Sequence, residues 1–297
     1  MTIVIKVGGA RAVDPAGALS DVATLVEGRS PSEQSSGEQS DPRDDEDGES
    51  VAVVHGGSTA VDDTLEHLGM EPEYVETPSG VVGRFTDERT MEVFEMVFGH
   101  LNTQLVAGLQ SLDVDAVGLN GVDGKLLHGP RKSAVRVKED GKKKIKRGDH
   151  SGTIKEVNED LLESLLSDGY VPVASPPMAG ADDGEIIPVN TDADRSAAAI
   201  AGALDGTLVL LTDVEGVYAD PDDPSTLIES VETGEEWDAL EDAAEGFMSR
   251  KIMAAEEALS EGAEEVVIAD ANADDPILSA LDGGGTHLYQ EALEDSA

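Results

Sequence analysis

Two lysines, far apart in the chain, stand where a positive charge could stabilise a phosphoryl group. A predicted buried strand ends in Lys6 and Val7 and is followed at once by Gly8 and Gly9, and glycines leave backbone N–H groups open to an anion. Lys251 stands near the start of a predicted helix. Each feature alone is weak evidence, because glycine turns and solvent-facing lysines are common. A role in stabilising a phosphoryl group therefore needs support from other residues of the chain.

A second glycine turn follows another predicted strand. Gly56, Gly57 and Ser58 stand between strand 51–55 and a helix, and Ser58 is expected to cap that helix. A helix N-terminus with flanking glycine amides can bind an anion, although the same residues also suit a plain capped turn. Two such strand–glycine–helix units would open at the carboxyl edge of one sheet, where α/β proteins bind ligands. The pair favours an anion site.

Polar residues follow three further predicted segments. Asn190, Asp192 and Asp194 lead into an alanine-rich helix, where they could project an amide and a carboxylate into one cleft. Helix capping is the alternative for Asp192 and Asp194. Asp213 follows another buried strand, and Arg84 follows a glycine-containing loop before the longest predicted helix. Arg84 is suited to clamp a carboxylate.

The elements that must position these residues alternate between short apolar runs and helical patterns. This alternation predicts an α/β protein with a central, mostly parallel sheet flanked by helices. Strands are expected at 2–7, 51–55, 115–120, 170–175, 207–212 and 264–269. Helices are expected near 16–27, 58–68, 87–112, 158–168, 192–203 and 247–262.

Two segments interrupt this alternation. Residues 28–50 are rich in Ser, Gly, Asp and Glu without apolar periodicity, which indicates a solvated acidic insertion. Residues 131–147 alternate in polarity around Asp140-Gly141, a two-residue turn, and predict an exposed β-hairpin. This basic hairpin holds nine of the chain's 20 lysines and arginines, namely Arg131, Lys132, Arg136, Lys138, Lys142, Lys143, Lys144, Lys146 and Arg147.

The chain as a whole is strongly acidic. It has 63 Asp and Glu residues among 297 and a formal net charge of −43, with the acidic residues spread through amphipathic segments, which suits the surface of a halophile's protein in concentrated salt. With no cysteine, disulfides and thiolate metal sites are excluded. The N-terminus lacks a signal-peptide pattern, and no apolar run reaches about 18 residues. These features predict a cytoplasmic protein without membrane contact.

Several enzyme classes lose support because their motifs are missing. There is no G-x-x-x-x-G-K-[ST] loop and no G-x-G-x-x-G after the first strand. The protein-kinase H-R-D and D-F-G motifs and the hydrolase G-x-S-x-G elbow are also missing. The six histidines show no metal-ligand spacing. P-loop ATPases, dehydrogenases, serine hydrolases and zinc enzymes are therefore disfavoured.

Taken in chain order, the motifs resemble the amino-acid kinase family. The segments that carry the resemblance are "IKVGG", "VVHGGS", "SGVVGRFTD", "NTDADRSAAAIA", "LLTDVEGVY" and "FMSRK". It covers the whole chain apart from 28–50. Within the family, the sequence is most similar to acetylglutamate kinases. It resembles still more closely the branch that phosphorylates glutamate or α-aminoadipate attached to the carrier protein LysW, through "RFTDERTMEVFEMV", "GLNGVDGKLL" and "GDHSGTIKEVN".

The resemblance implies one amino-acid (carbamate) kinase-like domain, an αβα sandwich over 1–297. Its N-terminal lobe, about 1–175, would face the substrate, and its C-terminal lobe, about 176–297, the nucleotide. The implied reaction is phosphoryl transfer from ATP, with Mg²⁺ held mainly by the ATP phosphates, to the ω-carboxylate of LysW-linked glutamate or α-aminoadipate. Phosphorylation of free N-acetyl-L-glutamate is the alternative. These products belong to arginine and lysine biosynthesis.

The resemblance also assigns roles to individual residues. Lys6 and Lys251 would be the catalytic lysines, oriented by Asp194. The nucleotide would lie against Gly8, Gly9, Gly57 and Asp213. The substrate would be held by Gly56, Gly57, Ser58, Arg84 and Asn190. No protein metal ligand is implied.

The basic hairpin gains a candidate partner from the same resemblance, since LysW-type carriers are small and acidic. Charge complementarity favours docking of such a carrier on the hairpin. A solubilising edge hairpin is the plain alternative. Nucleic acid is disfavoured, because no aromatic residue interrupts the cations for base stacking. The resemblance further implies a homodimer.

Overall fold

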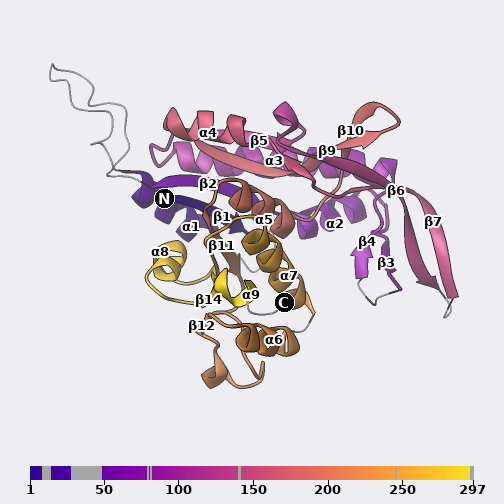
Figure 1. Ribbon diagram of the computed structural model, residues 1–297. Helices are drawn as coiled ribbons and strands as arrows, with labels where there is room; N and C mark the ends of the chain where they lie inside the picture. Colours follow the sequence, from indigo (N-terminus) through magenta and orange to yellow (C-terminus); the bar gives the residue numbers. More distant parts are fainter. Residues whose placement is uncertain are drawn as a thin grey trace, which may run out of the picture.

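The protein folds around one large sheet with helices on both faces (Figure 1). The computed structural model describes residues 1–8, 15–27, 49–78, 80, 82–139, 142–244 and 246–294. Gly9, the turn at Asp140-Gly141 and nearly all of the predicted insertion 28–50 lie outside these residues. Among the described helices, none is both long enough and apolar enough to cross a membrane.

The six strands expected from the sequence form the parallel centre of the sheet. They are β1 (Thr2–Val7), β2 (Ser50–His55), β5 (Ala116–Gly121), β9 (Val171–Asp182), β11 (Thr207–Thr212) and β13 (Glu265–Asp270). Their order is β13-β11-β1-β2-β9-β5, and all five pairings are parallel. β9 continues past its expected end at 175, because its second half pairs with β10 (Glu185–Val189) and β6. The predicted α/β fold is confirmed.

The six expected helices are present as well, within two residues at each end. They are α1 (Pro15–Val26), α2 (Ser58–His67), α3 (Glu88–Gln110), α4 (Glu159–Ser167), α5 (Ala193–Ala203) and α7 (Phe247–Ser260). Alternate strand residues serve the two faces: Ile3 and Ile5 pack with α1 and α3, and Val4 packs with the α4, α5 and α7 face. This alternation explains why nearly every residue of β1 is buried.

The basic hairpin is present and longer than expected. It consists of β6 (Leu127–Glu139) and β7 (Lys142–Gly152), paired antiparallel. The arm extends from the sheet edge at the right of Figure 1, beside the short hairpin of β3 (Tyr74–Glu76) and β4 (Val82–Arg84).

The remaining elements were not predicted, and most of them lie in the C-terminal third. They are β8 (Glu156–Val157), β10, β12 (Ser230–Val231), β14 (Thr286–Tyr289), α6 (Gly234–Ala243), α8 (Pro276–Leu281), α9 (Glu291–Glu294), the β3–β4 hairpin and the 3-10 turns Asp123–Lys125 and Pro224–Thr226. β14 pairs antiparallel with β13, which makes this edge of the sheet mixed. α8 is fixed to α1 by the buried Asp21 carboxylate, which accepts hydrogen bonds from the Ile277 and Leu278 N–H groups.

Candidate functional site

Three charged side chains from three elements meet at the carboxyl end of β1. Lys6 Nζ lies 2.6 Å from Asp194 Oδ1, and Lys251 Nζ lies 3.2 Å from Asp194 Oδ2. Lys6 comes from β1, Asp194 from the first turn of α5, and Lys251 from the start of α7. The structure therefore brings together the two lysines and the carboxylate that the sequence singled out.

The local sequence explains why Asp194 is available to the lysines. The Asp192 side chain caps α5, because its Oδ1 accepts hydrogen bonds from the backbone N–H groups of Asp194 (2.9 Å) and Arg195 (3.2 Å). Capping is thus carried out by Asp192 alone of the two carboxylates considered. The Asp194 side chain instead points to the lysines, and the alanines of α5 let α7 pack closely enough to bring Lys251 within reach.

The electrostatics of this Lys6–Asp194–Lys251 cluster follow from its burial. Burial raises the pKa of Asp194, but the charges of Lys6 and Lys251 outweigh it and hold the pKa at about 2. Burial, reinforced by the nearby Lys6 charge, lowers the pKa of Lys251, and Asp194 opposes that shift. Asp194 is therefore ionised at neutral pH. With both lysines protonated, the cluster carries a net positive charge.

The second glycine turn lies beside this cluster, with one difference from expectation. α2 begins at Ser58, and Gly57 occupies the N-cap position without a capping side chain from the described residues. The prediction that Ser58 caps the helix is therefore wrong. A Cβ at Gly57 would lie 2.6 Å from Leu101 Cδ1, so any larger residue there would require the Leu101 side chain to shift. The first N–H groups of α2 stay open to an anion.

Arg84 lies beside this turn, but in a different setting from the open clamp that was expected. Its guanidinium pairs with the Asp62 carboxylate and donates to Ser58 Oγ (2.8 Å), Ser58 O (3.0 Å) and the Tyr74 hydroxyl (3.1 Å). Only 5% of the side chain is exposed. Arg84 therefore holds Ser58 in place. Its Nε–H and one Nη1–H have no partner among the described residues.

Asn190 reaches the same region through Thr86. Its Nδ2 donates to Thr86 Oγ1 (3.0 Å), and its backbone N–H donates to His150 O (2.7 Å) at the base of the basic hairpin. The Thr86 N–H donates in turn to the buried Asp149 carboxylate (3.2 Å). The segment that carries Arg84, the residue Asn190 and the hairpin base are thus joined by one hydrogen-bonded network.

Gly8 and Asp213 occupy neighbouring strand ends at the carboxyl edge of the sheet. Gly8 follows β1 and is half-buried, whereas Gly9 lies outside the described residues. Asp213 follows β11 and is exposed, and it accepts a hydrogen bond from Thr212 Oγ1 (3.3 Å). Because β1 and β11 are parallel neighbours, both residues lie at the edge that holds the charged cluster.

Comparison with known proteins identifies the family. The model of the amino acid kinase family matches residues 1–270. The chain belongs to this family. Its curated relatives include the [LysW]-aminoadipate kinase of Deinococcus radiodurans, 40% identical over 96% of this chain and 90% of the relative. The acetylglutamate kinase of Methanopyrus kandleri is 44% identical over 79% of this chain and 89% of its own length.

Solved structures of low sequence identity share the amino acid kinase fold. The carbamate kinase of Giardia matches with a TM-score of 0.59 at 14% identity, over 97% of this chain and 98% of the other. An N-acetylglutamate synthase from Neisseria gonorrhoeae matches with a TM-score of 0.73 at 23% identity. That match covers 97% of this chain, which spans only 59% of the synthase. These likenesses confirm the expected fold and carry no statement about substrates.

The sequence did not single out His55, a buried residue beside the second glycine turn. Its Nδ1 lies 3.0 Å from Gly56 O and its Nε2 lies 3.3 Å from Asn102 Nδ2. Burial lowers the pKa of His55 to about 4, against its hydrogen bond to Gly56 O and with help from the Lys6 charge. A neutral ring that donates from Nδ1 and accepts at Nε2 satisfies both contacts. Its position at the end of a buried strand was the available signal.

Asp62 and Tyr74 were also missed, because they act through Arg84. The Tyr74 hydroxyl donates to Asp62 Oδ2 (2.7 Å), and the ring lies 5.3 Å from the Arg84 guanidinium carbon. Nothing in the local sequence of either residue distinguishes it from an ordinary surface residue. Their role follows only from the meeting of α2, β3 and β4.

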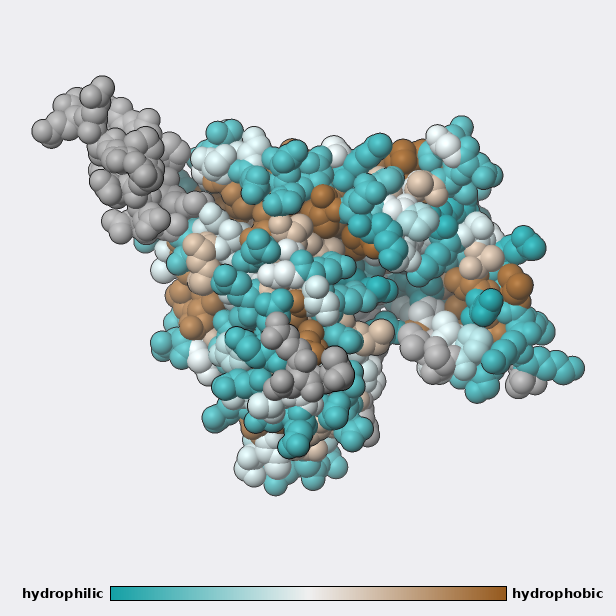
Figure 2. Space-filling view, in the orientation of Figure 1, coloured by the Kyte–Doolittle hydropathy of each residue, from teal (hydrophilic) through white to brown (hydrophobic). Residues whose placement is uncertain are grey.

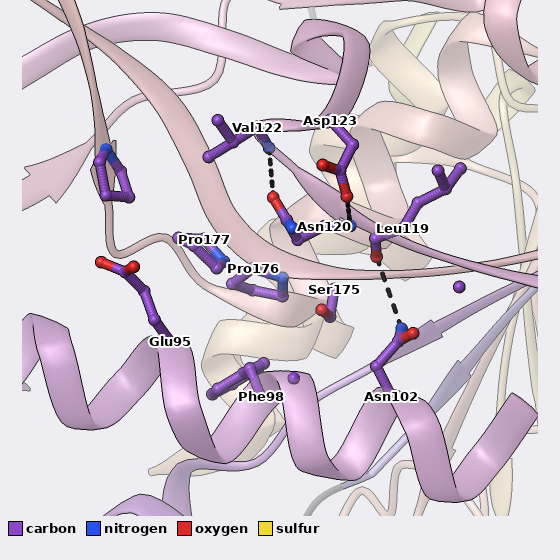
Figure 3. A pocket seen from close by; sticks show the side chains of 13 residues that line it. Glu95, Phe98, Asn102, Leu119, Asn120, Val122, Asp123, Ser175, Pro176 and Pro177 are labelled. Atoms are coloured by element: carbon purple, nitrogen blue, oxygen red, sulfur yellow. Dashed lines mark hydrogen bonds between the residues drawn. The ribbon is translucent and has the colours of Figure 1, made fainter.

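A cavity of about 430 Å³ lies between α3, the second half of β5 and the middle of β9 (Figure 3). It is lined by Glu95, Phe98, Gly99, Asn102, Gly118, Leu119, Asn120, Val122, Asp123, Ser175, Pro176, Pro177 and Pro188. None of the predicted site residues lines it. It adjoins the site through Asn102, which bonds His55, and through Phe98, whose ring stacks on His55. In the part of the chain that is described, no three His, Asp or Glu side chains are arranged to hold a metal ion.

Proposed function

We propose that this protein transfers the γ-phosphoryl group of ATP to the ω-carboxylate of glutamate or α-aminoadipate linked to the carrier protein LysW. The product would be an acyl phosphate. The observation that carries the proposal is the buried Lys6–Asp194–Lys251 cluster at the carboxyl edge of a kinase-family sheet. Relatives named for LysW-linked substrates, at 36–40% identity, support the choice of acceptor.

This reaction requires the protein to position two reacting groups and to neutralise their negative charge. Two anions, the phosphoryl group and the acceptor carboxylate, must be held in line while their repulsion is neutralised. Lys6 and Lys251 approach from two sides, and Asp194 fixes their spacing with one bond to each. Because the three groups carry a net positive charge in a buried setting, they favour the charge that develops on the transferring oxygens.

ATP and Mg²⁺ fit the residues present. The uncapped start of α2 at Gly57 and the backbone at Gly8 offer N–H donors for phosphate, and Asp213 lies at the same edge. Gly9 is proposed as a further contact from the family resemblance. Because the described residues hold no cluster of metal ligands, Mg²⁺ would be held mainly by the nucleotide phosphates. The metal would neutralise phosphate charge there. We place the nucleotide on the lobe of about 176–297.

The acceptor would lie on the side of the lobe formed by about 1–175. Arg84 would offer its two remaining N–H groups to the substrate carboxylate, and Asn190 and the Gly56–Ser58 turn would hold the blocked amino group. The basic hairpin 131–147 would dock the acidic carrier and bring its bound amino acid to the turn. The network from the hairpin base to Thr86 supports this arrangement, since it joins the docking arm to the substrate residues.

A second candidate is phosphorylation of free N-acetyl-L-glutamate. The 44% identity to an acetylglutamate kinase favours it. The two candidates share the same catalytic groups and differ only in what the hairpin does. We place the activity in arginine or lysine biosynthesis in the cytoplasm, and we expect a homodimer.

The deciding experiment traps the acyl phosphate as a hydroxamate in concentrated KCl with ATP and Mg²⁺. Free N-acetylglutamate is compared with glutamate and α-aminoadipate, each attached to LysW. Turnover restricted to the carrier-linked substrates is expected, and it should vanish in Lys6→Ala and Lys251→Ala. Reversal of Lys142, Lys143 and Lys144 to Glu should raise KM for carrier-linked substrate. Efficient use of the free substrate would favour the second candidate instead.

A further inference from the structure

The outer face of the basic hairpin has one apolar residue at its centre. Ile145 is directly opposite Arg136 in the β6–β7 register, and its neighbours at two-residue spacing on β7 are Lys143 and Arg147. Cross-strand partners and alternate residues share one face of a sheet. Ile145 is 67% exposed, and its three cationic neighbours are exposed as well. Figure 2 shows hydrophobic side chains among hydrophilic ones on this arm at the right.

The opposite face of the hairpin is turned toward the body of the protein. Val137 is only 2% exposed there. Lys146, on the same face, lies 4.0 Å from the centre of the Phe85 ring and pairs with Glu73. The inner face is therefore occupied within the molecule, and the face that carries Ile145 is the one open to a partner.

Three of the cations around Ile145 form no ion pair within the described part of the chain. Arg136, Lys143 and Arg147 have no carboxylate partner among the residues that the structure describes, in a chain with a net charge of −43. Lys138, at the end of the same face, instead pairs with Glu76 at 3.2 Å. An exposed isoleucine alone would need no explanation. Its position inside a ring of unpaired cations on a projecting arm does need one.

We propose that Ile145 is the apolar anchor of the carrier-docking surface, ringed by Arg136, Lys143 and Arg147. This inference rests on the proposed function, in which the acidic carrier LysW docks on the hairpin. The matching surface of the carrier would present an apolar patch ringed by carboxylates. The ring orients the carrier, and burial of Ile145 retains it.

The two parts of this surface respond to salt in opposite ways. The Debye length falls to about 3 Å at 1 M salt, so the contribution of the cations shrinks. Apolar burial does not depend on charge and is strengthened by salts excluded from the protein surface. The docking surface therefore changes from mainly electrostatic in dilute salt to mainly apolar in concentrated salt.

The test compares Ile145→Thr with Ile186→Thr, which makes the same change at an isoleucine of β10 that is 42% exposed. Threonine keeps the β-branched shape, so both strands should be preserved. Binding of LysW is measured by calorimetry, and KM for LysW-linked substrate by the hydroxamate assay. Both are measured in about 0.1 M and about 2 M KCl.

Ile145→Thr should raise Kd and KM about tenfold, with the loss fully retained at high salt. A variant with Arg136, Lys143 and Arg147 changed to Gln should show the reverse, with a loss that largely disappears at high salt. Ile186→Thr should match the wild type. Normal carrier turnover with equal KM for Ile145→Thr and Ile186→Thr would overturn the anchor and leave the proposed function standing. Carrier binding that depends on Ile145, without any turnover, would support the surface and refute the proposed function.

Discussion

Replacing Asp194 by asparagine separates charge from shape at the centre of the site. No more than 14% of any of the three side chains of the Lys6–Asp194–Lys251 cluster is exposed, and the carboxylate lies within 3.2 Å of both ammonium groups. The variant leaves two buried cations with no counter-ion. Removal of one partner from a buried ion pair destabilises proteins by about 3–5 kcal/mol. We expect a loss near the lower end, since Lys251 can release its proton more easily than a group with an ordinary pKa.

The loss of that proton predicts the kinetics. Without Asp194, the pKa of Lys251 should fall further, because Asp194 is the main group that raises it and Asp192 contributes less. The expected fall in kcat at neutral pH is on the order of 10²–10³. The residual activity should increase as the pH is lowered, when Lys251 regains its proton. Denaturant unfolding gives the stability, and the hydroxamate assay at saturating ATP gives kcat against pH.

Asp192→Asn is the matched control. It removes one negative charge two residues away from Asp194, and asparagine caps a helix as well as aspartate does. Its stability and kcat should stay close to those of the wild type. If Asp194→Asn and Asp192→Asn had the same unfolding free energy and the same kcat, the cluster would not hold its lysines as argued.

Three further predictions follow from other contacts. Gly57→Ala should destabilise the fold by about 1–3 kcal/mol in denaturant unfolding, because its Cβ would meet Leu101 at 2.6 Å, and Leu101→Ala should restore most of the loss. Arg84→Lys should raise KM for the amino-acid substrate about tenfold with a smaller change in kcat, since lysine cannot reproduce the guanidinium contacts; an unchanged KM would contradict its binding role. The hydrogen bond between His287 and Glu265 (2.6 Å) raises the pKa of the histidine and lowers that of the glutamate. The contribution of His287 to folding stability is therefore complete below pH 6.5 and is lost as the pH rises through its raised pKa. The contribution of Glu265 to folding stability is complete above pH 4.5 and is lost on acidification. Melting from about pH 5.5 to about pH 8.5 should show a falling Tm in the wild type and a flatter profile in His287→Gln, and equal slopes would argue against the pair.

The parallel centre of the fold could be predicted because most of its strands contain a continuous apolar run. Residues 207–212, buried throughout, are such a run, and so are most of 50–55. The C-terminal edge offered no such signal. Thr286–Tyr289 is a four-residue strand that follows three glycines and pairs antiparallel, and Pro276–Leu281 is a helix of six residues. Short elements of this kind depend on their neighbours and show little periodicity of their own.

The candidate site could likewise be predicted only in part. Strand ends and helix starts made Lys6, Asp194 and Lys251 candidates, because parallel strands open at one edge, and the family resemblance assigned their roles. The contacts of Arg84 could not be predicted, since its ion-pair partner Asp62 is 22 residues away in the chain. Ser58 was predicted as the cap of α2 from residue type alone. The approach of Leu101 and Phe98 instead places Gly57 at the cap, which only the tertiary packing determines.

The acidity of the chain makes the arrangement of its few cations informative. On a surface with 63 carboxylates and 20 lysines and arginines, a cation usually has a carboxylate within reach. Within the basic hairpin, Arg131, Lys138 and Lys146 follow this expectation, with partners at Asp182, Glu76 and Glu73. These pairs fix the arm to β9 and to the β3–β4 hairpin that carries Arg84. The division into cations paired with neighbouring elements and unpaired cations around Ile145 is what a docking arm requires: a rigid base joined to the proposed substrate residues, and charge left over for a partner.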